Sequence, residues 1–233
     1  LKKISENEGL IFLTTPFDTE SLKEVSKLDL DAYKIASTDT TNIEFIKEIA
    51  KKKKPLLIST GMTYMTEINK MLEEVSTINN KIILLQCTSD YPLDDNEVNL
   101  NVLNSFKEEF NLLVGFSDHS IGFEASKIAV GMGAKVIEKH FTLDKSFPGP
   151  DHSTSLNPKE LKEFISSLKN TKVLMGSKIK EPTKSELSTR KSLQKCIVAK
   201  KNINKNDFFS LKNLCSKRTG GEGISAFYLK DFI

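Results

Sequence analysis

Short apolar runs alternate with amphipathic stretches along this chain, and this repeat restricts the possible folds more than any other feature of the sequence. The runs are Leu10–Thr14, Ala32–Ile35, Pro55–Ser59, Lys81–Cys87, Leu112–Phe116 and Lys135–Glu138. A strand with apolar side chains at consecutive positions is typical of a parallel sheet that is covered on both faces. The sequence therefore predicts a series of parallel strands.

Helical patterns with polar starts separate these runs. We expect helices to begin near Asp18, Thr41, Thr66, Leu100, Phe123 and Asn157. The last pattern extends to Met175 and carries Pro158 in its first turn, a position where proline is well tolerated. Strands that alternate with helices in this way form βαβ units with right-handed crossovers.

Two α/β architectures accommodate such units, a doubly wound sheet and a barrel. Polar residues follow nearly every predicted strand, which favours a TIM (β/α)8 barrel, because all strand ends of a barrel surround one site. A doubly wound sheet would concentrate them at one switch point. We predict that residues 1–177 form strands three to eight of such a barrel, with its first two strands before Leu1.

The pattern changes after about Gly176. Residues 178–187 are polar and contain Pro182, so we expect a linker there. Residues 188–233 contain a strand-like run at Ser192–Lys200 and the turn-rich sequence Arg218-Thr219-Gly220-Gly221. They predict a second, small, β-rich module.

Composition excludes several classes of protein. The chain has 34 basic and 31 acidic residues, a balance that gives no basis for nucleic-acid binding. No apolar run approaches the roughly 20 residues of a membrane helix, so no membrane association is predicted. The three cysteines have no C-x-x-C spacing, which indicates reduced thiols in a cytoplasmic protein. Cys87 is interpreted as a buried strand thiol rather than a nucleophile, because no histidine occupies an obvious adjacent position.

Two of the three histidines follow successive predicted strands. His119 comes after the run Leu112–Phe116, and His140 comes after the next run. Histidines at neighbouring barrel strand ends point into one mouth, where neutral imidazoles bind Mn, Fe, Co or Zn. The pair predicts a divalent-metal site, although either histidine alone would more often be a hydrogen-bonded or capping residue.

A second group of side chains is suited to an anion. Lys34 lies among apolar residues of its predicted strand, where an ammonium group needs an anionic partner. Ser59-Thr60-Gly61 ends a strand and opens a helix, where backbone N–H groups and the helix dipole favour phosphate. The hydroxyl candidates are Thr15, Ser37, Ser59 and Ser117. Any one of them is more often a helix cap, but together with a lysine they predict a phosphorylated substrate.

A third group is suited to a polar organic substrate. Ser89 and Tyr91 follow the strand that ends at Cys87, and Asp151 lies in the loop after the last strand. Asp151 can accept hydrogen bonds from sugar hydroxyls, and Tyr91 can pack against a ring or chain. The alternative is that these are turn residues that stabilise their own loops.

Six motifs occur in a specific order along the chain. They are Thr15-Pro16-Phe17, Tyr33-Lys34-Ile35-Ala36-Ser37, Ser59-Thr60-Gly61-Met62, Cys87-Thr88-Ser89-Asp90-Tyr91-Pro92, Gly115-Phe116-Ser117-Asp118-His119-Ser120 and Glu138-Lys139-His140-Phe141-Thr142. In this order they resemble the sialic acid (N-acetylneuraminate) synthase family, which includes legionaminic and pseudaminic acid synthases. Residues 190–233 are similar to that family's C-terminal antifreeze-like (SAF) domain, cut short.

The resemblance implies a transferase that condenses phosphoenolpyruvate with an N-acyl hexosamine for surface glycan biosynthesis. N-acetylmannosamine and a 2,4-diacetamido-trideoxyhexose are examples of the sugar. The enol carbon attacks the open-chain aldehyde, water adds to the oxocarbenium centre that results, and C–O cleavage releases phosphate. Gly149-Pro150-Asp151-His152 is closer to the sialic and legionaminic members than to the pseudaminic ones.

The resemblance also implies roles for individual residues. His119 and His140 would hold Mn²⁺ or Mg²⁺, and Lys34 would act with them at the catalytic centre. Phosphoenolpyruvate would be bound by Lys34, Thr15, Ser37, Ser59 and Ser117, with Ser89 standing where many members have asparagine. Tyr91 and Asp151 would face the sugar, and Arg218 would reach the sugar of the other subunit in a domain-swapped homodimer.

Some features of the family pattern are absent from this chain. The catalytic glutamate and a further lysine of the first two barrel strands are missing, so we expect these residues by themselves to be inactive. Thr219 stands where a proline is usual. Two alternatives stay open, a Schiff-base barrel aldolase that uses Lys34 as its nucleophile and a non-catalytic sugar-binding relative.

Overall fold

A computed structural model describes residues 1–233 and divides the chain into two compact units, Leu1–Gly176 and Ser177–Ile233. The larger unit is built on a five-stranded parallel sheet with the strand order β1-β2-β3-β4-β5. Its strands are β1 (Tyr33–Ile35), β2 (Leu56–Ser59), β3 (Ile82–Cys87), β4 (Leu113–Asp118) and β5 (Val136–Lys139).

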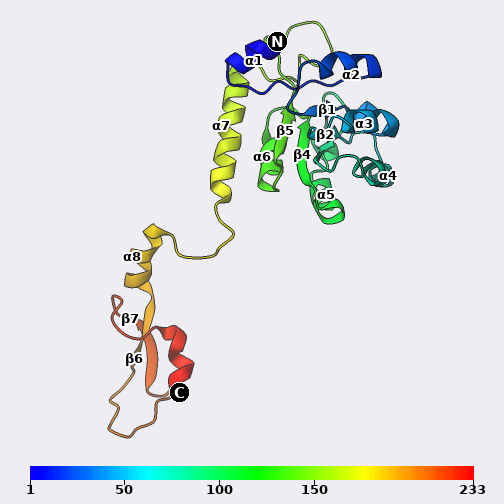
Figure 1. Cartoon of the computed structure of the whole chain (residues 1–233). Coiled ribbons are helices and arrows are strands. Elements are labelled where there is room, and N and C mark those ends of the chain that lie inside the picture. The colour runs from blue at the N-terminus through cyan, green and yellow to red at the C-terminus, as the bar shows by residue number, and fades with distance from the viewer. The chain divides into compact units, whose positions relative to one another are not determined.

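The strand order distinguishes the two predicted architectures. A doubly wound sheet reverses its order at a switch point, whereas a barrel adds each new strand beside the previous one. Here every strand pairs in parallel with the next one along the chain, and the sheet curls (Figure 1). The prediction of an α/β fold with a barrel-like parallel sheet is confirmed in this form, as a curled half-barrel.

Helices connect the strands. They are α1 (Lys2–Asn7), α2 (Thr19–Ser26), α3 (Ile43–Ala50), α4 (Met65–Val75), α5 (Val102–Phe110), α6 (Glu124–Gly131) and α7 (Pro158–Met175), with the short 3₁₀ turns η1 (Ser37–Asp39) and η2 (Asp95–Glu97). The predicted start of α7 is confirmed, because the side chain of Asn157 accepts a hydrogen bond from the Glu160 amide at 3.0 Å. Helix α4 starts slightly before the expected Thr66, because the Glu67 carboxylate accepts a hydrogen bond from the Tyr64 amide.

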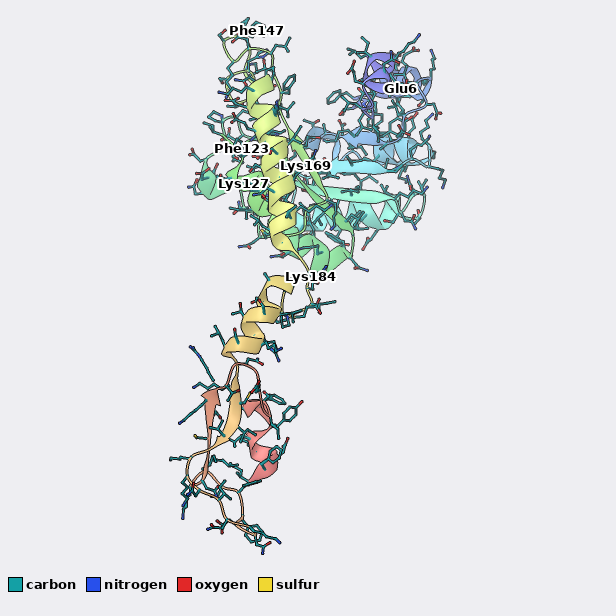
Figure 2. All side chains as sticks on the ribbon, turned by 90° about the vertical axis from the view of Figure 1, so that its left-hand side faces the viewer. Glu6, Phe123, Lys127, Phe147, Lys169 and Lys184 are labelled. Carbon is teal, nitrogen blue, oxygen red and sulfur yellow. The ribbon has the colours of Figure 1, made fainter.

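The hydrophobic core lies between the sheet and these helices. Figure 1 shows α3, α4, α5 and α6 around the outside of the curved sheet. Strand side chains that face the helices are almost completely buried; Ile58, Leu84 and Phe116 are examples. Figure 2 faces α7, beside which Phe123 and Lys127 lie, and the Phe123 ring is 6.1 Å from that of Phe164 in α7. The inner face of the sheet is less covered, and Leu113 on that face is 55% exposed.

The strand predicted at Leu10–Thr14 does not form. This segment is extended, but a single backbone hydrogen bond, from the Lys34 amide to the Thr14 carbonyl at 3.4 Å, joins it to β1. Phe12 packs against the hydrophobic core, but Leu10 and Ile11 are 63% and 70% exposed, so the run is not buried on both faces as a central strand would be. Without a regular ladder the segment stays irregular.

The smaller unit contains α8 (Lys184–Leu193), β6 (Lys195–Ala199), β7 (Leu214–Arg218) and η3 (Ala226–Phe232), with β6 and β7 antiparallel. Helix α8 occupies the last part of the segment predicted as a linker, because Thr183 and Glu186 form a capping box. The helix continues to Leu193, so β6 is shorter than the run that predicted it. No helix in either unit combines the length and apolar character that crossing a membrane requires.

Gly115 lies in β4 and is in close contact with the neighbouring strands β3 and β5, all three of which carry candidate site residues. A Cβ atom at this position would lie 2.7 Å from the Val136 carbonyl oxygen and 3.1 Å from Leu85. We expect Gly115→Ala to lower the free energy of unfolding by about 1–3 kcal/mol, because the crowded strands must move apart. Urea denaturation measures the change, and Gly131→Ala in α6, where the new methyl group has room, serves as the control. Equal stability of both variants would contradict the close approach of β4 and β5.

Candidate active site

The candidate site lies where the strands end at the inner face of the sheet. Cys87, Ser117 and Glu138 are neighbours in the registers of β3, β4 and β5. His119 and His140 follow two positions later along β4 and β5. Because side chains alternate between the faces of a sheet, these five residues share the inner face.

The two histidines lie side by side, as the sequence predicts. Their ring centroids are 5.2 Å apart in an edge-on arrangement, and His119 is buried. His119 Nδ1 lies 2.7 Å from the Thr88 carbonyl oxygen, which only accepts, so Nδ1 carries the proton. The lone pair of the ring is therefore on Nε2, the atom through which a histidine oriented in this way binds a metal.

Tyr91 and Asp151 complete this imidazole cluster. The Tyr91 hydroxyl lies 3.0 Å from His119 Nε2, and burial raises the pKa of Tyr91 to about 12, so the hydroxyl stays protonated and donates. Asp151 Oδ2 lies 3.8 Å from His140 Nδ1. Burial and the nearby His119 lower the pKa of His140, which favours the neutral ring that a metal requires.

A second cluster surrounds Gly61, just beyond the end of β2. The Gly61 amide donates to Ser37 Oγ at 3.0 Å, and a Cβ atom on Gly61 would collide with Ser89 Oγ. Two hydroxyls and a backbone N–H therefore converge at a position where any side chain larger than that of glycine would collide with them. Groups of this kind bind phosphate and carboxylate oxygens.

Ser59 adds an unpaired donor to the same strand end. Its hydroxyl is buried and has no hydrogen-bond partner in the protein. A buried hydroxyl without a partner costs free energy, and such groups are rare in folded proteins. The missing partner is consistent with an anionic ligand at this position.

Lys34 and Ser117 meet at a residue that the sequence analysis missed. Glu138 Oε1 accepts from Ser117 Oγ at 2.6 Å, and Glu138 Oε2 lies 3.5 Å from Lys34 Nζ. Lys34 also donates to the Ile35 carbonyl oxygen at 2.9 Å. The position of Glu138, two residues before His140 in a strand, was the available signal, because that spacing puts both side chains on one face.

Cys87 joins the two clusters, contrary to the expectation that no histidine is near it. Its sulfur lies 4.0 Å from His119 Nδ1 and 3.5 Å from Ser37 Oγ. The histidine is distant in sequence, but the register that pairs Cys87 with Ser117 brings it close. The imidazole and hydroxyl clusters are therefore parts of one site.

Two further predicted residues belong to other segments of the chain. Thr15 is half-buried in the extended segment before α2, and no hydrogen bond joins it to the clusters. Arg218 is exposed at the end of β7 in the smaller unit. The other predicted residues all belong to the strand ends of the larger unit and the loops that follow them.

The donor set fits a metal that binds together with its substrate. No group of three or more His, Cys, Asp or Glu side chains is arranged to hold a metal ion. His119 and His140 supply two nitrogen ligands, so a divalent ion there would take its other ligands from water or substrate.

Comparison with known proteins identifies the family. Residues 1–180 match the NeuB family. The chain belongs to this family. It is 44% identical over 228 residues to N,N'-diacetyllegionaminic acid synthase of Campylobacter jejuni, covering 97% of this chain and 68% of the relative. It is 38% identical to pseudaminic acid synthase of the same species, covering 92% and 62%.

A solved structure supports the NeuB assignment. The crystal structure of N-acetylneuraminic acid (sialic acid) synthetase from Leptospira borgpetersenii superimposes with a TM-score of 0.77 at 32% identity, over 82% of this chain and 68% of that one. The chain thus spans about two thirds of the length of its NeuB-family relatives.

The unpaired Ser59 hydroxyl leads to a stability prediction. Ser59→Ala should raise the free energy of unfolding of the ligand-free protein by about 1 kcal/mol, because it removes a buried donor that has no partner. Thr60→Val is the matched control: the Thr60 hydroxyl donates to the Leu85 carbonyl at 2.9 Å, so its loss should cost about 1 kcal/mol. Denaturant titration separates the two signs. A loss of stability in both variants would show that Ser59 has a partner.

Proposed function

We propose that this NeuB-family chain is the larger part of a nonulosonic acid synthase that condenses phosphoenolpyruvate with an N-acyl hexosamine and releases phosphate, for surface glycan biosynthesis. One observation carries the proposal: an oriented imidazole pair and a hydroxyl cluster share one strand-end site, joined by Cys87. The relatives are named as synthases of legionaminic, pseudaminic and sialic acids, which supports the same reaction class.

The hydroxyl cluster is proposed to bind phosphoenolpyruvate. The Ser37 and Ser89 hydroxyls lie against the side of Gly61 where a Cβ atom would be, the Gly61 amide donates to Ser37, and the buried Ser59 hydroxyl has no partner. The Lys34 ammonium supplies positive charge near the end of β1. Ser117 and Thr15 are proposed as further phosphoenolpyruvate ligands because of the family resemblance. Ser117 is paired in register with Cys87, which contacts the hydroxyl cluster.

His119 and His140 are proposed to hold Mn²⁺ or Mg²⁺. An ion bound there would polarise the sugar aldehyde as a Lewis acid. The protein contributes the orientation: the Thr88 carbonyl fixes the ring of His119, and burial favours the neutral form of His140. The Tyr91 hydroxyl, which donates to His119 Nε2, is proposed to donate to a sugar oxygen when substrate is bound.

The bond changes in the proposed reaction balance without an oxidant or reductant. The C=C π pair of phosphoenolpyruvate forms the new C–C bond to the aldehyde carbon as the aldehyde C=O π bond opens, and the aldehyde oxygen takes up a proton. Water adds to the oxocarbenium carbon and loses a proton, which balances the proton taken up. The tetrahedral intermediate then breaks its C–O bond to phosphate and leaves a 2-keto group, with the hydroxyl proton going to phosphate. Asp151, 3.8 Å from His140, is proposed to accept hydrogen bonds from sugar hydroxyls beside the reacting carbon.

The smaller unit is proposed to be the antifreeze-like (SAF) domain, which would bring Arg218 to the sugar of the other subunit in a homodimer. Charge supports this proposal. Residues 177–233 carry 13 Lys and Arg against five Asp and Glu, whereas residues 1–176 carry 21 against 26. Opposite net charges favour the approach of one copy's small unit to another copy's larger unit.

The surroundings of Lys34 weigh against a Schiff-base aldolase. A Schiff-base lysine must reach the carbonyl carbon of its substrate. The Lys34 Nζ atom instead donates to the Ile35 carbonyl oxygen at 2.9 Å and lies 3.5 Å from the Glu138 carboxylate, so it is directed at oxygen atoms of the protein. We therefore propose that Lys34 acts as an anion ligand.

The two mechanisms give different results with borohydride. After incubation of the full-length protein with pyruvate or phosphoenolpyruvate and sodium borohydride, we expect no covalent adduct on Lys34 by peptide mass spectrometry. A barrel aldolase of the Schiff-base class, treated in parallel, is the positive control. A reduced pyruvate adduct on Lys34 would overturn the assignment of this residue.

A panel of sugars tests the function directly. Full-length protein with Mn²⁺ and phosphoenolpyruvate should release phosphate only when a suitable N-acyl hexosamine is present, because carbon–carbon bond formation precedes C–O cleavage. A 2,4-diacetamido-trideoxyhexose should be the best substrate, since identity is higher to N,N'-diacetyllegionaminic acid synthase of Campylobacter jejuni, at 44%, than to N-acetylneuraminate-9-phosphate synthase of Homo sapiens, at 34%. N-acetylmannosamine is the comparison. Saturable sugar binding without phosphate release across the panel would favour the non-catalytic alternative.

A further inference from the structure

A buried ion pair lies directly behind the two histidines. Asp118 is the last residue of β4 and Lys139 the last of β5, and they are paired in register. Asp118 Oδ2 and Lys139 Nζ are 3.1 Å apart, with side chains 0% and 3% exposed. The next residues along the chain are His119 and His140, which therefore lie on the opposite face of the sheet.

The ion pair also fixes the backbone on both sides of His119. Asp118 Oδ1 accepts hydrogen bonds from the Ser120 amide at 2.9 Å and from the Ser120 hydroxyl at 2.6 Å, and Lys139 donates to the Ser120 carbonyl oxygen. The second carboxylate oxygen accepts from Ser126 Oγ of α6 at 2.5 Å. Asp118 and Ser120, on either side of His119, are thus both bonded to Lys139 at the end of β5.

A pair of charged side chains is unusual on this buried, helix-facing side of the sheet. Val114 and Phe116, on the same face of β4, are apolar and almost fully buried. Two apolar side chains in place of Asp118 and Lys139 would avoid the cost of removing two charges from water. The charges instead specify how β4 pairs with β5. A slip of one residue would turn every side chain of the strand to the other face, and one charge would then be buried without its partner.

We propose that Asp118 and Lys139 are positioning residues for the histidine pair: their buried ion pair locks the ends of β4 and β5 in register and so holds His119 and His140 at the spacing that a shared ion requires. This rests on the proposed function for the metal, but the geometry it describes exists without metal. Residues that orient ligands from behind contribute about 10- to 100-fold to metal affinity in other proteins.

The first test measures Mn²⁺ binding by electron paramagnetic resonance on the full-length protein. Asp118→Leu combined with Lys139→Met replaces both charges, which should preserve folding, yet we expect binding about 10- to 100-fold weaker than wild type. Val114→Ala, on the same face of β4, is the control for general loss of stability and should bind normally. Wild-type affinity in the double variant would overturn the proposal.

The second test needs no metal. The protein has three histidines, so the ¹⁵N imidazole signals can be assigned by substitution. In wild type, His119 should be a single tautomer with its proton on Nδ1, bonded to Thr88. The double variant should show mixed tautomers or exchange broadening at His119 and His140, with His152 unchanged. Unaltered His119 and His140 signals would refute the positioning role.

The two readouts separate the possible failures. If His119→Ala and His140→Ala bind Mn²⁺ as wild type does, or wild type does not bind it, the metal assignment in the proposed function fails. The imidazole spectra then decide the positioning role alone. If the histidine variants lose Mn²⁺ binding but the double variant keeps wild-type affinity and imidazole signals, the ion pair has no positioning role. The proposed function then stands.

Discussion

The hydrogen-bonded register between β4 and β5 is the constraint on which the site depends. Because side chains alternate across the sheet, pairing Ser117 with Glu138 puts these residues and the two following histidines on the inner face. The same register puts Asp118 and Lys139 on the helix-facing side of the sheet, where each buried charge is stabilised by the other. A single backbone relation therefore sets both the contents of the site and the contents of the core behind it.

The two faces of the sheet divide stability and function between them. The helix-facing side carries closely packed apolar residues and supplies the hydrophobic free energy of folding. The inner side carries the polar groups of the candidate site, among them the unpaired Ser59 hydroxyl and the Lys34–Glu138 pair. The Asp118–Lys139 pair is the charged exception on the helix-facing side, and it is buried directly behind the histidines.

The parts of this structure that the sequence predicts are those set by local pattern. Apolar runs and helix caps located β1 to β5 and α7, and the positions of the histidines after two strands indicated that they meet. The extended segment at Leu10–Thr14 was mispredicted because its apolar pattern does not show whether a packing partner is present. The bond from His119 to the Thr88 carbonyl and the contact with Cys87 depend on register and loop conformation, which no local pattern specifies. Glu138 lies two residues before His140, so the alternation of side chains along a strand predicts that both face the site.

The central claim is that the imidazole pair and the hydroxyl cluster form one site for a metal ion and phosphoenolpyruvate. Crystals of the full-length protein grown with Mn²⁺ and phosphoenolpyruvate test this most directly, through anomalous scattering at the manganese edge. The account predicts one anomalous peak within bonding distance of His119 Nε2 and a ring nitrogen of His140, with an anion bound by Ser59 and Gly61. A manganese peak elsewhere, or an anion that leaves the Ser59 hydroxyl unpaired, would contradict it.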